Sequence, residues 1–307
     1  MMRASLLILF FSFLFANCHD SKQTQYDDVP TRGEIKIAVD ESYTLLFDTE
    51  IYTFQSFYKY AKIHARYQPE SEAVKYLLND SVRFAVMSRE LNEDEKKYFE
   101  NKKLIPRITK IAVDAVALIV NNNNPDTLFT LAQIKALFSG KDTLWNQVNS
   151  SRKAEPVQIV FDNSGSSNAR FIKEKILNNQ PFPKNCFAVQ SNPQVIDYVN
   201  KNPHAIGVIG VNWMSDHDDT LSLSFLKKVK FVALSNGKEK EFYKPYQAYI
   251  QLNNYPFCRN VYIISREARA GLGTGFASFV AGDKGQRIIL KAGLIPAIAP
   301  VRIVEVK

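Results

Sequence analysis

Short runs of apolar and β-branched residues alternate along the chain with longer stretches in which apolar residues recur at helical spacing. The extended run at residues 35–39, for example, precedes a stretch at 44–60 that places Phe47, Ile51 and Phe54 on one helical face. Alternation of this kind favours a mostly parallel sheet covered by helices on both faces, and two α/β lobes account for it better than one continuous sheet. The predicted strands are 35–39, 62–67, 82–87, 108–120, 157–161, 205–211, 229–234, 261–264 and 301–306. The predicted helices are 44–60, 71–78, 93–101, 130–138, 168–177, 193–200, 276–280 and 285–292.

The composition is that of an ordinary globular protein with a modest positive charge. Among 307 residues, 46% are hydrophobic and 23% are charged, and the formal net charge is +8. These proportions exclude wholesale disorder and a polytopic membrane protein. Because the basic residues are spread along the chain without a Lys/Arg block, we expect no nucleic-acid partner. Three cysteines are too few for a disulfide scaffold, and Cys186 and Cys258 are predicted to be two separate thiols.

The N-terminus differs from the rest of the chain. Met1, Met2 and Arg3 precede an uncharged apolar run at residues 4–16, which is too short to span a bilayer as a helix. A basic start and a short apolar run are typical of a secretory signal, and the break before Cys18 resembles that of a bacterial lipoprotein. We predict a signal peptide at 1–17, lipidation of Cys18, and a flexible polar tether at 18–32. The alternative is ordinary cleavage nearby, with no special role for Cys18.

Hydroxyl-rich loops follow four of the predicted strands. In an open α/β sheet, ligands bind beyond the carboxyl ends of the strands, where helix N-termini offer free N–H groups that suit oxyanions. Ser and Asp are also common helix caps, so a single loop of this kind has an equally good structural explanation. Four such loops in step along one chain favour a binding site. They are Asp40 to Thr44, Gln68 to Glu72, Ser88 with Arg89, and Asp162 to Ser167.

Catalytic motifs are weak in comparison. The chain has no G-x-S-x-G nucleophile elbow and no G-x-x-x-x-G-K-[ST] phosphate loop. Of its four histidines, His217 lies in an acidic loop that could contact a metal, although a solvated loop is the better interpretation. We therefore predict no enzymatic activity, no cofactor and no metal site. An exported phosphatase that uses Ser164, Ser166 or Ser167 is the weakest alternative.

Four further segments carry an ordered set of motifs. They are Ser88-Arg89-Glu90-Leu91, the run NPHAIGVIG at 202–210, Tyr255-Pro256-Phe257-Cys258-Arg259, and a closing segment with Phe279, Gly285-Gln286 and KAGLIP at 291–296. In this order they resemble the substrate-binding proteins of ABC phosphate transporters, over about residues 34–297. The resemblance implies the two-lobed periplasmic-binding-protein fold (type II), an α/β fold with mixed, mostly parallel sheets and a hinge of two chain crossings.

The resemblance also implies which residues hold the ligand. Carried over by position, they are Ser42, Tyr43, Thr44, Ser71, Ser88, Arg89, Asp162, Ser164, Gly165, Ser166 and Ser167. The chain departs from the family pattern in these loops, because Asp162 stands near the place of a family arginine, Asp40 and Glu41 lie in the first loop, and Glu70 and Glu72 flank Ser71. Carboxylates beside a desolvated dianion cost several kcal/mol unless they are protonated or turned away.

The resemblance finally implies a domain division and a function. One lobe is predicted to comprise 33–112 with 229–307 and the other 113–228, with chain crossings near 110–118 and 222–232. The expected function is capture of inorganic phosphate or a similar oxyanion for an ABC permease. The expected form is a monomer held by lipid at a membrane of the bacterial cell envelope, on the periplasmic side. Two alternatives remain, namely the same fold with a cationic or zwitterionic solute, and a sensor or scaffold role.

Overall fold

The computed structural model describes residues 28–235, 237 and 241–298. The predicted signal, Cys18 and most of the tether lie outside these residues, as does the predicted strand at 301–306. Within the described part of the chain, no helix is long and apolar enough to cross a membrane.

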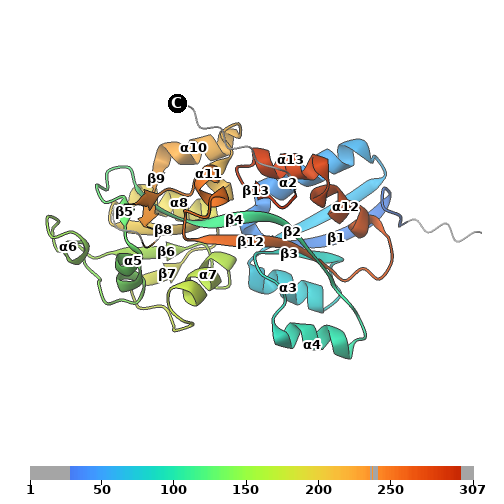
Figure 1. Cartoon of the computed structure of the whole chain (residues 1–307), viewed down its shortest axis with the longest axis horizontal. Coiled ribbons are helices and arrows are strands. Elements are labelled where there is room, and N and C mark those ends of the chain that lie inside the picture. The colour runs from blue at the N-terminus through green and yellow to red at the C-terminus, as the bar shows by residue number, and fades with distance from the viewer. Residues whose placement is uncertain (1–27, 236, 238–240, 299–307) are drawn as a thin grey trace, which may run out of the picture.

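Two lobes lie side by side, and one curled mixed sheet of ten strands runs through both (Figure 1). The strand order is β2-β1-β3-β12-β4-β8-β6-β7, with β9 and β13 paired to β4. Strands β2, β1 and β3 are parallel in the first lobe, and β7, β6 and β8 are parallel in the second. The antiparallel pairs involve β12 and β4, which lie between these two sets. The predicted two-lobed α/β fold with mixed sheets is thus confirmed.

The elements of the first lobe agree with the predicted ones to within a few residues, except that η2 and β13 were not predicted. Its strands are β1 (Gly33–Asp40), β2 (Ala61–Gln68), β3 (Phe84–Met87), β12 (Cys258–Ser265) and β13 (Ile295–Pro296), with β4 (Arg107–Asn121) shared between the lobes. Its helices are the 3-10 turn η2 (Glu41–Tyr43), α2 (Thr44–Phe57), α3 (Glu70–Leu78), α4 (Glu93–Asn101), α12 (Leu272–Ala281) and α13 (Asp283–Lys291).

The second lobe contains the predicted elements and several short ones that the pattern does not reveal. Its strands are β5 (Leu128–Phe129), β6 (Gln158–Phe161), β7 (Cys186–Ala188), β8 (Ala205–Gly210), β9 (Val229–Phe231), β10 (Ala233–Ser235) and β11 (Phe242–Tyr243). Its helices are α5 (Leu131–Phe138), α6 (Trp145–Val148), α7 (Ser167–Lys175), α8 (Asn192–Lys201), α9 (Asn212–Ser215) and α10 (Thr220–Lys228), while α11 (Gln247–Gln251) lies near β4 and β13. The predicted strand at 229–234 is two strands, β9 and β10, separated by Val232.

One long strand joins the lobes. The N-terminal part of β4 pairs with β12, and its C-terminal part pairs with β8 and β9. The long apolar run of β4 is buried on both sides, as is expected of a strand at the centre of a sheet. The second crossing is predicted near 222–232, but β9 pairs with β4 beside β8, and β10 pairs with β5. We therefore propose that the second crossing lies later, between β11 and β12, at residues 244–257.

Helices cover both faces of the first-lobe strands. Helices α3 and α4 close one face over a small core that includes Val74, Leu77 and Phe99. On the other face, Phe276 of α12 contacts the rings of Phe47 and Phe54 of α2, at 6.3 and 5.2 Å between ring centroids. With these faces buried, the loops that follow β1, β2 and β3 are left at the end of the sheet that meets the second lobe.

Gly207 of β8 allows close packing in the second lobe. A Cβ atom at this position would lie 2.7 Å from side-chain carbons of Ile119 and Val195 and 2.8 Å from Val199. Because β4 and α8 hold these three side chains in a close-packed core, Gly207→Ala is expected to destabilise the protein by about 1–3 kcal/mol. Chemical denaturation measures this effect, and an unchanged midpoint would contradict the packing described.

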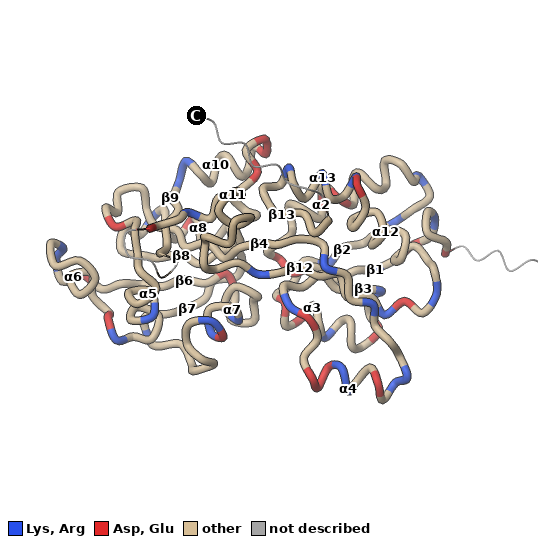
Figure 2. The backbone as a smooth tube through the Cα atoms, in the orientation of Figure 1, with Lys and Arg blue, Asp and Glu red and all other residues tan. Residues whose placement is uncertain are grey.

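Charged residues of both signs are distributed over the two lobes (Figure 2). Helix α4 illustrates this, because acidic residues fill its first turn and Lys96 pairs with Glu93 on its surface. No single-sign surface stands out in this view of the described residues.

Candidate functional site

The loops singled out in the sequence meet where the two lobes face each other. The Ser71 N–H donates to the carbonyl of Gly165 at 3.1 Å, which joins the start of α3 to the loop before α7. The hydroxyls of Ser42 and Ser167 lie 3.4 Å apart. These contacts join segments that are distant in the sequence, so the lobes are closed on each other at this point.

A buried arginine lies at the centre of the interface. Arg259 of β12 donates from Nε to the Asp114 carboxylate at 2.8 Å and from Nη1 to the Ser167 hydroxyl at 3.0 Å. The Tyr43 hydroxyl donates to the same Asp114 oxygen at 3.0 Å, so this hydroxyl forms a hydrogen bond inside the protein. Arg259 and Asp114 are almost fully buried, and together they connect β4 and β12 to α7.

A second buried network surrounds Asp162 at the end of β6. Its carboxylate accepts from the Ser166 hydroxyl at 2.6 Å, from the Asn168 amide at 3.0 Å and from the Asn192 amide at 3.1 Å. Ser166 also caps α7 by accepting from the Ala169 N–H. In place of the cation that the family pattern has nearby, this chain holds a carboxylate surrounded by its own donors.

Three carboxyl groups at this interface bind protons more tightly than usual. Burial and the nearby Glu70 raise the pKa of Asp40 to about 7, although Arg259 opposes the shift. Burial and the charge of Asp162 raise the pKa of Glu41 to about 8, and burial raises the pKa of Asp162 to about 6. An unfolded chain releases these protons near pH 4. The stability that these protons contribute is therefore fully present below about pH 4, and it is lost progressively as the pH rises from there to the folded pKa values of about 6, 7 and 8.

The mouth of the interface carries half-buried cationic groups. A cavity of about 380 Å³ there is lined by Glu70, Ser71, Arg89, Ser164, Gly165, Ser166, Ala169, Arg170, Lys173, Asn179 and Phe182. Arg170 of α7 reaches across to the first lobe and donates from Nη2 to the Ser88 hydroxyl at 2.9 Å. Arg89 is held by Glu95, with its two terminal nitrogens 2.7 and 2.8 Å from the carboxylate oxygens.

Most of the predicted ligand-binding residues lie at the interface, whereas some form other contacts. Ser42, Ser71, Ser88, Gly165, Ser166 and Ser167 come together at the interface, and the exposed Ser164 and half-buried Arg89 line its mouth. The Thr44 hydroxyl instead donates to the Glu41 carbonyl within its own turn. Glu72, predicted near the ligand, faces outward and pairs with Lys75 at 2.6 Å. Whether each of these residues contacts a ligand stays a prediction.

Sequence reasoning missed several residues that build this site. Asp114 could have been found from the sequence, because it is a lone carboxylate inside the apolar run of β4. Arg259 lies in the motif at 255–259, to which the sequence analysis assigned no role. Arg170 lies in the predicted helix at 168–177 and carries no motif that would mark it as part of the site. Asn168 and Asn192 give no comparable signal, since surface and buried asparagines are alike in sequence.

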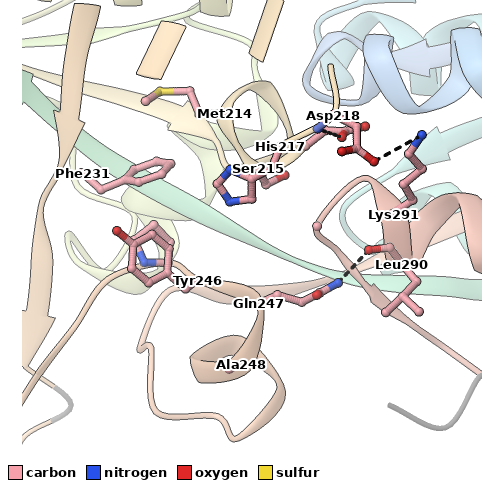
Figure 3. A pocket seen from close by; sticks show the side chains of 13 residues that line it. Met214, Ser215, His217, Asp218, Phe231, Tyr246, Gln247, Ala248, Leu290 and Lys291 are labelled. Carbon is pink, nitrogen blue, oxygen red and sulfur yellow. Dashed lines mark hydrogen bonds and ion pairs between the residues drawn. The ribbon is translucent and has the colours of Figure 1, made fainter. Parts of the chain in front are cut away.

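A different cavity lies on another part of the molecule. It has a volume of about 370 Å³ and is lined by residues of 214–218, 231, 245–248, 290–291 and 293 (Figure 3). The acidic loop with His217 borders it, and Asp218 there pairs with Lys291 at 3.5 Å. In the described residues, no group of three or more His, Cys, Asp or Glu side chains is arranged to hold a metal ion. Cys186 and Cys258 are free thiols, as predicted.

Residues 24–284 match the family model described as the PBP superfamily domain. The chain belongs to the PBP superfamily. This membership and the relatives below confirm the resemblance predicted from the motifs, and they support a binding protein rather than an enzyme.

Curated relatives include phosphate-binding proteins named PstS. The protein of Staphylococcus epidermidis strain ATCC 35984 is 30% identical over 207 residues, which cover 66% of this chain and 60% of the relative. The protein of Staphylococcus aureus strain USA300 is 29% identical over 231 residues, which cover 74% and 67%. The chain thus spans about 60% of the length of the first of these relatives.

Solved structures show the same fold. A phosphate ABC transporter substrate-binding protein with bound phosphate from Clostridium perfringens is 22% identical, has a TM-score of 0.73, and is matched over 86% of this chain and 100% of its own. An ABC-type phosphate transport receptor from Vibrio cholerae is 20% identical, with a TM-score of 0.65 and the same coverage. At these identities the similarity establishes the fold of this PBP superfamily member.

Proposed function

We propose that this protein captures inorganic phosphate or a related oxyanion between its two lobes and delivers it to an ABC-type permease. The observation that carries the proposal is the meeting of Ser88 from one lobe with Arg170 from the other, at a cavity that Arg89 and Lys173 also line. Hydroxyls and guanidinium forks are the donors that oxyanions prefer. The names of the curated relatives, which are phosphate-binding proteins, support the same ligand.

The buried carboxyl groups influence which oxyanion the site prefers. Asp40 and Asp162 have pKa values raised into the neutral range, so each accepts or donates a proton at low cost. A phosphate that carries a proton donates a hydrogen bond to such a carboxylate, whereas sulfate at neutral pH has no proton to donate. The acidic residues that depart from the family pattern therefore favour phosphate over sulfate.

Titration calorimetry of residues 28–307 with phosphate and with sulfate tests this function. At pH 7.5 we expect saturable binding of phosphate and at least tenfold weaker binding of sulfate, because sulfate meets unprotonated carboxylates. Equal affinities would show that the carboxyl groups are not ligands. If neither anion produces heat at millimolar concentration, the oxyanion function is wrong, and cationic or zwitterionic solutes become the ligands to test.

We also propose that the N-terminal segment exports the protein and anchors it at a membrane. A signal at 1–17 and a lipid on Cys18 would hold a monomer at the bacterial cell surface or on the periplasmic side of a membrane, within reach of a permease. Two or more acyl chains anchor firmly, since each buried methylene contributes about 0.8 kcal/mol. Metabolic labelling with a palmitate analogue tests the anchor: Cys18→Ser should abolish the label, and persistent labelling would contradict it.

A further inference from the structure

The Glu70 carboxylate is buried at the interface and is surrounded by donors. Its Oε1 atom accepts from the Ser88 N–H at 2.8 Å and from the Ser88 hydroxyl at 2.9 Å. Its Oε2 atom accepts from Arg170 Nε at 2.5 Å, and Arg170 Nη2 lies 3.3 Å from Oε1. Arg89 Nε is a further 3.6 Å ion-pair partner. Glu70 is only 2% exposed, so these groups replace its water.

This set of donors is the kind that holds a bound oxyanion. It combines a backbone N–H, a hydroxyl, a guanidinium fork and the N-terminus of α3, of which Glu70 is the first residue. Burial by itself would raise the pKa of Glu70, but Arg170, Arg89 and the Ser88 N–H outweigh it and hold that pKa below its ordinary value. Glu70 thus stays a carboxylate anion at neutral pH.

The donors also come from both lobes. Ser88 follows β3 in the first lobe, whereas Arg170 is on α7 in the second. Arg170 has another partner, Glu174, at 2.7 Å on its own helix, and Arg89 is held by Glu95. Arg170 is thus connected to the first lobe by the Glu70 carboxylate and by the Ser88 hydroxyl, and Glu70 supplies the negative charge at this contact.

We propose that Glu70 is a built-in anionic ligand of this site, which bridges the closed lobes in place of an external oxyanion and competes with it for Ser88 and Arg170. The proposal rests on the proposed function, because it concerns the site at which that function places the oxyanion. A dianion that enters beside an ionised Glu70 is repelled, so the carboxylate must leave its donors first. The cavity of about 380 Å³ that Glu70 lines gives the side chain room to do so.

The consequence is a receptor whose specificity and resting conformation depend on one residue. With Glu70 in place, the lobes close without a ligand, and an oxyanion binds only by displacing the carboxylate. Without the carboxylate, Arg170 keeps a strong preference for an anion, and an external oxyanion supplies it.

The Glu70→Gln variant tests the proposal, since it removes the charge and keeps the shape. The matched control is Glu72→Gln, which removes a carboxylate two residues away that is turned outward to Lys75. Affinity for inorganic phosphate is measured by calorimetry at pH 7.5, and lobe closure of the ligand-free proteins by small-angle X-ray scattering. We expect Glu70→Gln to bind phosphate at least tenfold more tightly than wild type and to be more open without phosphate. The control should match wild type in both measurements.

The two readouts separate this proposal from the proposed function. Equal or weaker phosphate binding by Glu70→Gln, with unchanged scattering, would overturn the competition and the bridge. If no variant binds phosphate, the proposed function fails, and scattering still decides whether Glu70 bridges the lobes: opening in Glu70→Gln alone supports the bridge, and closure in all three proteins overturns it.

A second variant keeps the test decisive if Glu70→Gln does not fold. Glu70→Asp retains the charge but shortens the side chain by one methylene, which withdraws the carboxylate from Ser88. We expect a phosphate affinity and an opening between those of wild type and a protein without the carboxylate. A Glu70→Asp protein that equals wild type in both measurements contradicts the proposal.

Discussion

Replacing Arg259 by methionine is expected to lower the free energy of unfolding by about 3–5 kcal/mol, because it leaves the Asp114 carboxylate buried without its cation. The two side chains are 3% and 0% exposed and 2.8 Å apart, so water has no access to compensate. Arg259 also donates to Ser167, and its loss removes a contact between β12 and α7. Chemical denaturation followed by circular dichroism measures the change.

A surface pair supplies the control for this experiment. Arg287 and Asp283 form an ion pair at 3.0 Å on α13, and both side chains are 76% exposed. Arg287→Met should change stability by less than about 0.5 kcal/mol, since exposed ion pairs are weak. The double variant Asp114→Asn with Arg259→Met should regain part of the loss, because it contains no lone buried charge. A single Arg259→Met variant within 1 kcal/mol of wild type, as an approximate threshold, would contradict this account.

Replacing Glu50 by methionine is expected to stabilise the protein at neutral pH. Glu50 of α2 is fully buried, and within the described residues neither of its carboxyl oxygens has a hydrogen-bond partner. Burial raises its pKa from 4.5 to about 9. The unfolded chain releases the proton near pH 4.5 and the folded chain keeps it, so wild-type stability falls as the pH rises from 4.5 to 9. Methionine has a similar unbranched shape and no proton to retain.

The pH dependence makes this prediction specific. The stability difference between Glu50→Met and wild type should grow by about 1.4 kcal/mol per pH unit between pH 4.5 and 9, so at pH 7.5 it should be roughly 4 kcal/mol larger than at pH 4.5. Denaturation at several pH values measures the slope. The control Glu100→Met, at an exposed position of α4, should show no such slope. A pH-independent difference for Glu50→Met would mean that the carboxyl group is ionised in the folded protein, and the explanation by burial would fail.

The carboxyl groups of the acidic loops have different environments in the folded protein. Carboxylates beside a dianion are expected to be protonated or turned away, and the carboxyl groups of these loops differ in both respects. The Asp40 and Asp162 carboxyl groups are buried with raised pKa values, whereas Glu72 points outward to Lys75. Glu70 follows neither course, because it lies inward as an anion among donors from both lobes. Neighbours in the sequence do not distinguish Glu70 from Glu72, and only their directions on α3 do.

The order of the main strands and helices, the two-lobed class of fold and the loops that form the interface can be predicted from the sequence, because hydrophobic periodicity and loop chemistry are local properties. The start of α2 and the bounds of β4 are predicted to within one residue, whereas the division of 229–234 into β9 and β10 and the short strand β11 are not. The contacts of Arg259 with Asp114, of Arg170 with Ser88 and of Glu70 with the donors between the lobes emerge only in the folded protein. These pairs are distant in the chain or depend on which way a side chain points, and packing of the two lobes decides both.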